Sequence, residues 1–135
     1  MVTPHILKDE TEDIFLKEKI ISSTATSLVT EMMVNTVEMG YGRTARVPGY
    51  YIAGKTGTAQ VSLAKLGLPG NSYYEKTIQS FIGFAPALNP QFIIFVRLDL
   101  PDTKSAEVSA GPVFKEVAEY ILEYKKIPYD YEVLK

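Results

Sequence analysis

The stretch that decides the fold is Ala53-Gly-Lys-Thr-Gly-Thr-Ala-Gln60, near the middle of the chain. In a β-strand, side chains two positions apart share a face, so Thr56 and Thr58 should both donate hydroxyl hydrogen bonds to one ligand. Lys55 would direct a cation toward an anionic carboxylate, and Gly57, on the opposite face, leaves room for close packing. The backbone N–H of Thr58 could stabilise an oxyanion. The stretch therefore predicts a strand equipped to bind a carboxylate near a reacting carbonyl group.

A helix is predicted before this strand, from about Thr24 to Met39. Ser22 and Ser23 are typical N-cap residues, and Gly40 and Gly42 end the helical pattern. The apolar positions recur at helical spacing and form one stripe, which should fill the core: Ala25, Leu28, Val29, Met32, Met33 and Val37.

Two more strands are predicted after the quoted stretch. The first strand should start at Tyr50, and the segment 59–76, which contains glycine and proline, is predicted to be a loop. Residues 78–85 alternate between two faces, which is typical of a strand. Residues 92–98 are nearly all apolar and predict a strand buried on both faces. A short turn at 86–90 would join these two strands as a hairpin.

A second helix is predicted near the end of the chain. Pro112 suits a first helical position, and Pro128 disfavours helix beyond Lys126. The fold class is therefore α+β, an antiparallel sheet of about three strands packed by an N-terminal and a C-terminal helix. Residues 1–21 are predicted to be a leader or residual segment, and residues 22–135 to form the domain.

Composition excludes several classes of function. The 135 residues include 14 Lys and Arg, 16 Asp and Glu, one His and no Cys, with a formal net charge of −2. No nucleic-acid partner is expected, because such proteins usually carry a basic excess. Without cysteine there is no disulfide framework and no thiolate nucleophile. The single histidine, His5, lies in the polar leader and is expected to be inert.

The first thirteen residues contain no apolar stretch long enough for a signal peptide or a membrane span. Two interpretations follow. Either the protein is cytosolic, or the chain is a piece of a longer protein whose anchor lies elsewhere.

One motif matches a pattern that is typical of nucleotide-binding proteins. Residues 49–56 satisfy the phosphate-loop pattern G-x-x-x-x-G-K-[ST]. That loop needs a strand before its first glycine and a helix that begins at its lysine. Residues 43–48 do not form a strand pattern, and Gly57 disfavours a helix. Nucleotide binding is therefore not expected.

A second motif, Ser62-Leu-Ala-Lys65, is a formal S-x-x-K. It lies in a segment that contains glycine and proline and lacks a helical pattern. Because four-residue matches with two fixed positions are common by chance, Ser62 is not expected to be a nucleophile.

The sequence around the quoted stretch carries a family resemblance. Ser80-Phe-Ile-Gly-Phe-Ala-Pro86, Asn89-Pro90, Asp99-Leu-Pro101 and Gly111-Pro-Val-Phe-Lys-Glu116 follow it in order. Together these segments resemble the C-terminal part of a class B penicillin-binding protein transpeptidase domain, from about Ile20 to Tyr129. The Asp-x-Pro ending before the Pro-Val-Phe segment favours the division (septal) type over the elongation type.

The resemblance implies a fragment of the serine β-lactamase and transpeptidase-like fold and a role in peptidoglycan cross-linking. In this family the Lys-Thr-Gly strand binds substrate, which implies Lys55, Thr56, Gly57 and Thr58 as binding residues and Lys55 and Thr58 as catalytic ones. The implied partners are a peptidoglycan stem peptide and β-lactams, with no metal and no cofactor. The whole protein would be anchored in the cytoplasmic membrane, with this part on the extracytoplasmic side.

The chain departs from the family pattern, because it has no Ser-x-Asn and no credible S-x-x-K. The isolated chain is therefore expected to be catalytically inactive. Two alternatives remain: a fragment of a serine β-lactamase or β-lactam sensor, and a non-catalytic binding domain. The resembled fold would cover strand 92–98 with segments that precede it in the domain, so this chain is also expected to self-associate through that strand.

Overall fold

The computed structural model describes residues 21–133. His5 and nearly all of the predicted leader lie outside the described residues. The elements follow in the order α1 (Ser23–Glu38), η1 (Arg43–Ala45), β1 (Ala53–Ser62), η2 (Leu63–Leu66), β2 (Tyr73–Ala85), β3 (Phe92–Asp99) and α2 (Ala110–Tyr124). Among the described residues, no helix is long and apolar enough to cross a membrane.

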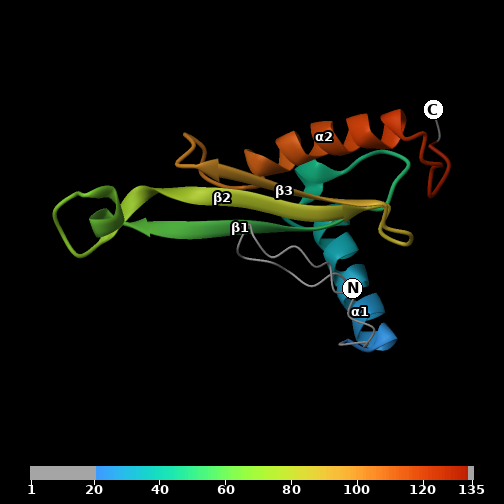
Figure 1. Ribbon diagram of the computed structural model, residues 1–135, viewed down its shortest axis with the longest axis horizontal. Coiled ribbons are helices and arrows are strands. Elements are labelled where there is room, and N and C mark those ends of the chain that lie inside the picture. Colours follow the sequence, from blue (N-terminus) through green and yellow to red (C-terminus); the bar gives the residue numbers. More distant parts are fainter. Residues whose placement is uncertain (1–20, 134–135) are drawn as a thin grey trace, which may run out of the picture.

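The three strands form one antiparallel sheet in the order β1-β2-β3. Helix α2 lies along one face of this sheet, while α1 projects away from it (Figure 1). The core lies between α2 and the sheet, where the rings of Phe81 and Phe114 are fully buried with their centroids 4.7 Å apart. The predicted α+β class and the three-stranded sheet with two helices are confirmed.

The alternation predicted for residues 78–85 is confirmed, and the structure shows which face is buried. The face that carries Gln79 and Phe81 is buried beneath α2 and its preceding loop, and the other is half-buried or exposed. Helix α2 begins at Ala110, so Pro112 lies within its first turn rather than at its first position. The missing N–H of proline costs nothing there, because first-turn N–H groups have no partner inside the helix.

The prediction of a loop at 59–76 is wrong over most of its length. Strand β1 continues to Ser62 and β2 starts at Tyr73, so only η2 and the turn after it remain irregular. The ladder passes through a register shift between Gln60 and Ser62, which the alternation pattern alone does not reveal. Residues 59–77 form a two-stranded arm beyond the end of β3, which extends to the left in Figure 1.

The N-terminal end of α1, which was predicted from its capping serine, is confirmed. The Ser22 hydroxyl accepts a hydrogen bond from the Ala25 N–H at 3.1 Å. The prediction that the apolar stripe of α1 fills the core is wrong for most of its length, because only Val37 is buried and Met32 is 61% exposed. The helix meets the core at its C-terminal end, and its other turns extend beyond it.

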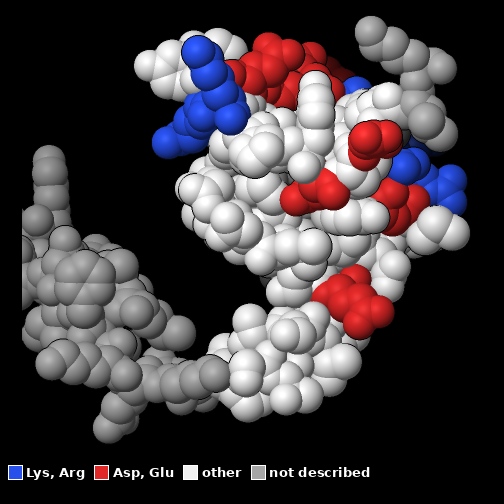
Figure 2. Space-filling view, turned by 90° about the vertical axis from the view of Figure 1, so that its right-hand side faces the viewer, with Lys and Arg blue, Asp and Glu red and all other residues white. Residues whose placement is uncertain are grey.

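The charge on α1 is low. Its only charged residues are Glu31 and Glu38. Figure 2 views the molecule from the right-hand side of Figure 1, and the helix forms a lower lobe with little charge.

The prediction that strand 92–98 is buried on both faces is also wrong. Val96 faces the core, but Ile93 and Phe95 are 67% and 61% exposed on the other face. Helix α2 covers one face of the sheet only, and among residues 21–133 no helix or strand covers these two side chains.

Candidate functional site

The four predicted binding residues, Lys55 to Thr58, lie together on β1. Strand β1 is at one end of the sheet order, and β2 is its only strand partner in the described part of the chain. The predicted binding residues therefore lie on an accessible edge strand.

The backbone of β1 has one set of groups directed at β2 and another directed outward. A Cβ built on Gly83 would lie 3.0 Å from the Ala53 carbonyl oxygen, so that oxygen points toward β2. In an antiparallel ladder this orientation alternates along the strand. Residues 53, 55 and 57 therefore bond to β2, while Thr56 and Thr58 direct their N–H and C=O groups to the free edge.

The Lys55 ammonium group reaches around this edge. The register places Lys55 opposite Ile82 and Thr56 opposite Phe81, so their side chains start on different faces. Nevertheless the Lys55 Nζ donates to the Thr56 carbonyl oxygen at 2.8 Å and to the Thr56 Oγ1 at 3.3 Å. The structure thus brings the ammonium group and one threonine hydroxyl together at the free edge.

Thr58 occupies the next outward-facing position of β1. Its side chain is exposed and shares a face with Thr56, as the sequence predicts. The hydrogen bonds described for Lys55 go to Thr56 and do not reach Thr58. A ligand lying along the free edge of β1 would therefore contact the Lys55 ammonium and the Thr56 hydroxyl together. The Thr58 N–H is the next outward-directed donor along the strand.

Gly57 has a packing role on the opposite face. It lies opposite Ser80, and a Cβ at this position would approach the Ser80 Oγ to 2.6 Å. The close approach expected of Gly57 is therefore confirmed, and Ser80 is the neighbour that requires it.

The buried side of the site is a polar cluster that the sequence reasoning missed. Gln79 lies opposite Thr58 and is only 1% exposed. Its Nε2 donates to the Thr103 carbonyl oxygen at 2.6 Å, and its Oε1 accepts from the hydroxyls of Thr103 at 2.9 Å and Ser109 at 2.5 Å. A glutamine in an otherwise apolar alternating face was the only signal in the sequence. The cluster fixes the loop before α2 against the strand that supports Thr58.

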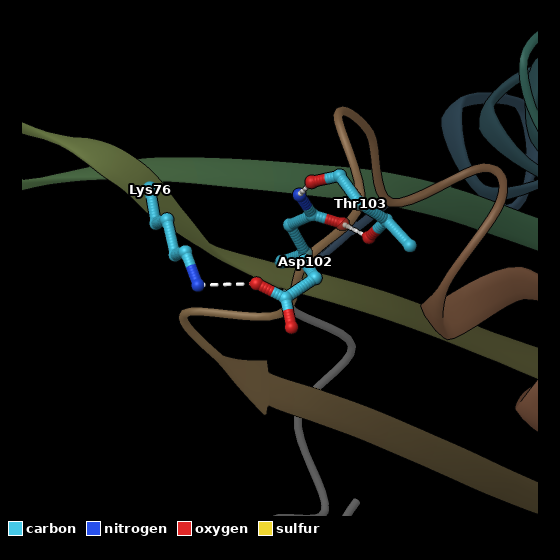
Figure 3. A network of polar contacts seen from close by, with 4 residues as sticks. Lys76, Asp102 and Thr103 are labelled. Atoms are coloured by element: carbon cyan, nitrogen blue, oxygen red, sulfur yellow. Dashed lines mark hydrogen bonds and ion pairs between the residues drawn. The ribbon is translucent and has the colours of Figure 1, made fainter.

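An ion pair connects the two-stranded arm, residues 59–77, to the same loop before α2. Figure 3 shows the Lys76 ammonium directed at the Asp102 carboxylate, next to Thr103. The hydrogen bond and the charge of Lys76 hold the pKa of Asp102 below its ordinary value of 3.8. The same contact raises the pKa of Lys76 above its ordinary value of 10.5.

We expect this ion pair to stabilise the fold at pH values between the lowered pKa of Asp102 and the raised pKa of Lys76. Because the pKa of Asp102 is lowered, its stabilising contribution is present above pH 3.8 and is lost as the pH falls through the lowered value. Because the pKa of Lys76 is raised, the contribution is lost again as the pH rises through that raised value. NMR titration should show the Asp102 pKa returning to its ordinary range in Lys76→Met. An unchanged pKa would contradict the pairing.

The start of β1 is held by the C-terminal segment. The Tyr50 hydroxyl donates to the Ile127 carbonyl oxygen at 2.6 Å, and the Asp130 Oδ2 accepts from the Tyr51 N–H at 2.8 Å. Burial, followed by the nearby Tyr129 and acidic groups, raises the pKa of Tyr50. Gly49 has φ +88°, and a Cβ there would lie 2.4 Å from the Tyr129 ring. These contacts set where the edge strand begins.

The two other motifs have structural roles. Lys55 lies in a strand and not at the start of a helix, which agrees with the rejection of the phosphate loop. The Ser62 Oγ accepts from the Lys65 N–H at 3.3 Å and caps η2. In the described residues there is also no group of three acidic or histidine side chains that could hold a metal ion.

The family model described as the penicillin binding protein transpeptidase domain matches residues 1–119. The chain therefore belongs to this family. Relatives named FtsI homolog and penicillin-binding protein 3 confirm the class B resemblance and its division type.

Curated relatives agree with this assignment. The chain is 35% identical over 115 residues to the "Peptidoglycan D,D-transpeptidase FtsI homolog" of Mesostigma viride, a match that covers 84% of this chain and 19% of the relative. It is 35% identical over 120 residues to the "Penicillin-binding protein PbpB" of Mycobacterium tuberculosis, covering 82% of this chain and 17% of that protein. The chain thus spans about a fifth of the length of these relatives.

Solved structures show the same fold. The transpeptidase domain of penicillin-binding protein 3 from Burkholderia pseudomallei superimposes with a TM-score of 0.66 at 29% identity, over 81% of this chain and 32% of that one. Penicillin-binding protein 3 from Mycobacterium tuberculosis, solved with ampicillin, gives a TM-score of 0.65 at 34% identity, over 81% of this chain and 25% of that one.

Proposed function

We propose that this chain forms the C-terminal part of a peptidoglycan D,D-transpeptidase and that the free edge of β1 binds its donor peptide. The observation that carries the proposal is the position of the Lys55 ammonium beside the Thr56 hydroxyl at this edge. Two outward-facing backbone positions, Thr56 and Thr58, let an extended peptide add alongside β1. The names of the relatives, which are D,D-transpeptidases, favour this function over a β-lactamase, a sensor or a non-catalytic domain.

Each residue has a distinct role in this proposal. Lys55 and Thr56 bind the terminal carboxylate of a D-Ala-D-Ala stem peptide, with Thr58 supplying a second hydroxyl. The Thr58 N–H stabilises the oxyanion that forms on the carbonyl group of the penultimate residue. Gly57 keeps Ser80 packed against the strand. A β-lactam would occupy the same edge as a mimic of the donor.

The reaction itself needs a serine from the rest of the domain. The serine oxygen attacks the carbonyl carbon, the peptide bond to the terminal D-Ala breaks, and D-Ala leaves with a proton. An amine of a neighbouring peptide then attacks the acyl-enzyme ester and releases the serine hydroxyl. In this proposal the whole protein is anchored in the cytoplasmic membrane, and this part lies on the outer side with its substrate.

Titration of the ¹⁵N-labelled chain with an acyl-D-Ala-D-Ala peptide tests the site. We expect the amide signals of Thr56 and Thr58 to shift, with weak binding. Lys55→Ala should weaken binding several-fold, by about 1 kcal/mol, because the cation is solvent-exposed. Lys65→Ala is the matched control, since Lys65 is also exposed but lies on η2. Equal binding by both variants, or shifts confined to other elements, would count against the proposal.

The isolated chain should form no covalent adduct with a penicillin. The physical reason is that the sequence has no credible S-x-x-K serine, and the remaining groups only bind and polarise the substrate. Intact-mass measurement after incubation with the antibiotic checks this. An equimolar adduct that maps to Ser62 would overturn our interpretation of that residue as a helix cap.

A further inference from the structure

The row of polar side chains on β1 continues beyond the candidate site. Side chains two positions apart share a face of a strand, so Gln60 and Ser62 lie on the face of Thr58. Gln60 is exposed, and it pairs with Thr77 in the same register as the site residues. By the alternation of the ladder, its N–H and C=O groups are also directed to the free edge. The edge of β1 therefore offers a further position to a bound peptide.

Packing does not account for this continuation. Strands β1 and β2 extend past Asp99, the last residue of β3, and form the arm of residues 59–77 (Figure 1). Val61 is the only buried residue of the arm, which the structure describes throughout. The arm thus contributes little to the core, and its main effect is to lengthen the edge of β1 in line with the site.

The lengthened edge ends beside an exposed aromatic ring. Ser62 pairs with Tyr73, and residues directly opposite each other in a ladder share a face. The Tyr73 side chain is 59% exposed. Beyond this pair the chain turns, because the Ser62 Oγ caps η2 and the Leu63 N–H donates to the Ser72 carbonyl oxygen at 2.9 Å. The polar row therefore ends at a tyrosine whose ring is available to a ligand.

The length of this edge matches the length of a peptidoglycan stem. The proposed function places the terminal carboxylate at Thr56 and the penultimate carbonyl group at Thr58, so the peptide runs antiparallel to β1 and toward the arm. In a pentapeptide stem, three residues precede the D-Ala-D-Ala and reach about 10 Å beyond Thr58 when they are extended. The sugar that carries the stem then lies about 13 Å beyond Thr58. Ser62, four residues further along β1, lies at that distance.

We propose, on the basis of the function proposed above, that the arm binds the sugar end of a stem peptide, with the Tyr73 ring against the sugar. A pyranose ring has an apolar C–H face and a rim of hydroxyl groups, and tyrosine combines an apolar ring with a polar tip. The intervening stem residues lie along β1, where main-chain hydrogen bonds to Gln60 hold them in register. The substrate class is therefore a stem peptide that is still attached to its sugar, and not a free peptide.

Titration of the ¹⁵N-labelled chain tests this extension with three ligands: acyl-D-Ala-D-Ala, the free pentapeptide stem, and the same pentapeptide joined to N-acetylmuramic acid. We expect the sugar to tighten binding about fivefold over the free pentapeptide, the size of a single aromatic contact. All three ligands should shift the Thr58 amide signal, and only the sugar-linked ligand should shift that of Tyr73. If no ligand shifts Thr58, the proposed function fails and the arm proposal fails with it. If Thr58 shifts but the sugar adds no affinity, the arm proposal alone is refuted.

Substitutions separate the contribution of the ring from that of the arm fold. Tyr73→Ala should remove the gain in affinity from the sugar and leave binding of acyl-D-Ala-D-Ala unchanged, whereas Tyr73→Phe should keep the gain. Tyr120→Ala is the matched control, since Tyr120 is 67% exposed on α2. Circular dichroism and the Thr58 shift with the short ligand check that each variant folds. A gain that survives Tyr73→Ala, or that Tyr120→Ala removes equally, would overturn the proposal.

The contact can also be measured without any substitution. In the wild-type chain we expect a nuclear Overhauser effect between the Tyr73 ring protons and the sugar protons of the bound ligand. Such an effect to Tyr120 instead, or to no tyrosine while Thr58 shifts, would refute the position of the sugar.

Discussion

Replacement of Phe114 by alanine is expected to lower the free energy of unfolding by about 3–5 kcal/mol. The ring is fully buried, and its plane is tilted 55° from that of Phe81 at a centroid distance of 4.7 Å. It also lies directly over Gly83, where a Cβ would come within 2.8 Å of the Phe114 Cζ. The backbone at Gly83 cannot move into the cavity without breaking the sheet, so the cavity should stay largely open.

Urea unfolding followed by circular dichroism measures this loss. Val113→Ala on the same turn of α2 is the control, because Val113 is 40% exposed and its truncation should cost less than about 1 kcal/mol. A double-mutant cycle with Phe81→Ala should show less than additive loss, since the two rings share one contact. If Phe114→Ala behaves like the control, the packing of α2 on the sheet is not as described.

The local elements were predictable because their signals are local. The hydroxyl of Ser22 caps α1 as expected, and the alternation in residues 78–85 predicted the two faces of β2, although not which of them is buried. The arm was not predictable, because Ser62 pairs with Tyr73 across a turn that contains glycine and proline. The register shift between Gln60 and Ser62 has no local sequence signal either. Propensity marked that segment as irregular, and long-range pairing overrode it.

Burial was harder to predict than secondary structure. The apolar stripe of α1 and the apolar run of β3 both imply a partner surface, but neither pattern says where that surface is. Met32 and Phe95 are exposed in the described structure because α2 covers a single face of the sheet and α1 extends past its end. The solved relatives are about three to four times longer than the part that matches. An apolar pattern in a sequence can thus predict a buried surface even when the residues that would bury it are not among those described.

The candidate site was also predictable only in part. The Lys-Thr-Gly motif identified Lys55, Thr56 and Thr58 because each side chain has chemistry of its own. That Thr56 and Thr58 direct their backbone groups at a free edge depends on which residues of β1 bond to β2, and only the ladder reveals it. Gln79 was missed because a single buried amide resembles any polar residue in a strand until its partners, 24 and 30 residues away, are known.

Gln79→Leu is expected to lower the free energy of unfolding by about 2–4 kcal/mol, although it preserves volume and adds apolar surface. Leucine would leave the Thr103 carbonyl oxygen and the Thr103 hydroxyl without their present partner. The Ser109 hydroxyl would keep only the Ser105 carbonyl oxygen, at 3.2 Å. Unsatisfied buried polar groups cost more than the hydrogen bonds themselves contribute. Gln60→Leu, an exposed change on β1, is the matched control and should alter stability by less than about 0.5 kcal/mol.

The cause can be separated from a general loss of stability. Thr103→Val combined with Gln79→Leu should cost less than the sum of the single changes, because Thr103→Val removes a hydroxyl that Gln79→Leu has already left without its partner. Hydrogen exchange should accelerate in the loop before α2 more than in the α2 helix itself. Because Gln79 lies opposite Thr58 in the ladder, the Thr58 amide signal should also move. A stable Gln79→Leu variant with an unchanged Thr58 signal would show that the buried amide neither holds this loop nor supports the edge at which the substrate is proposed to bind.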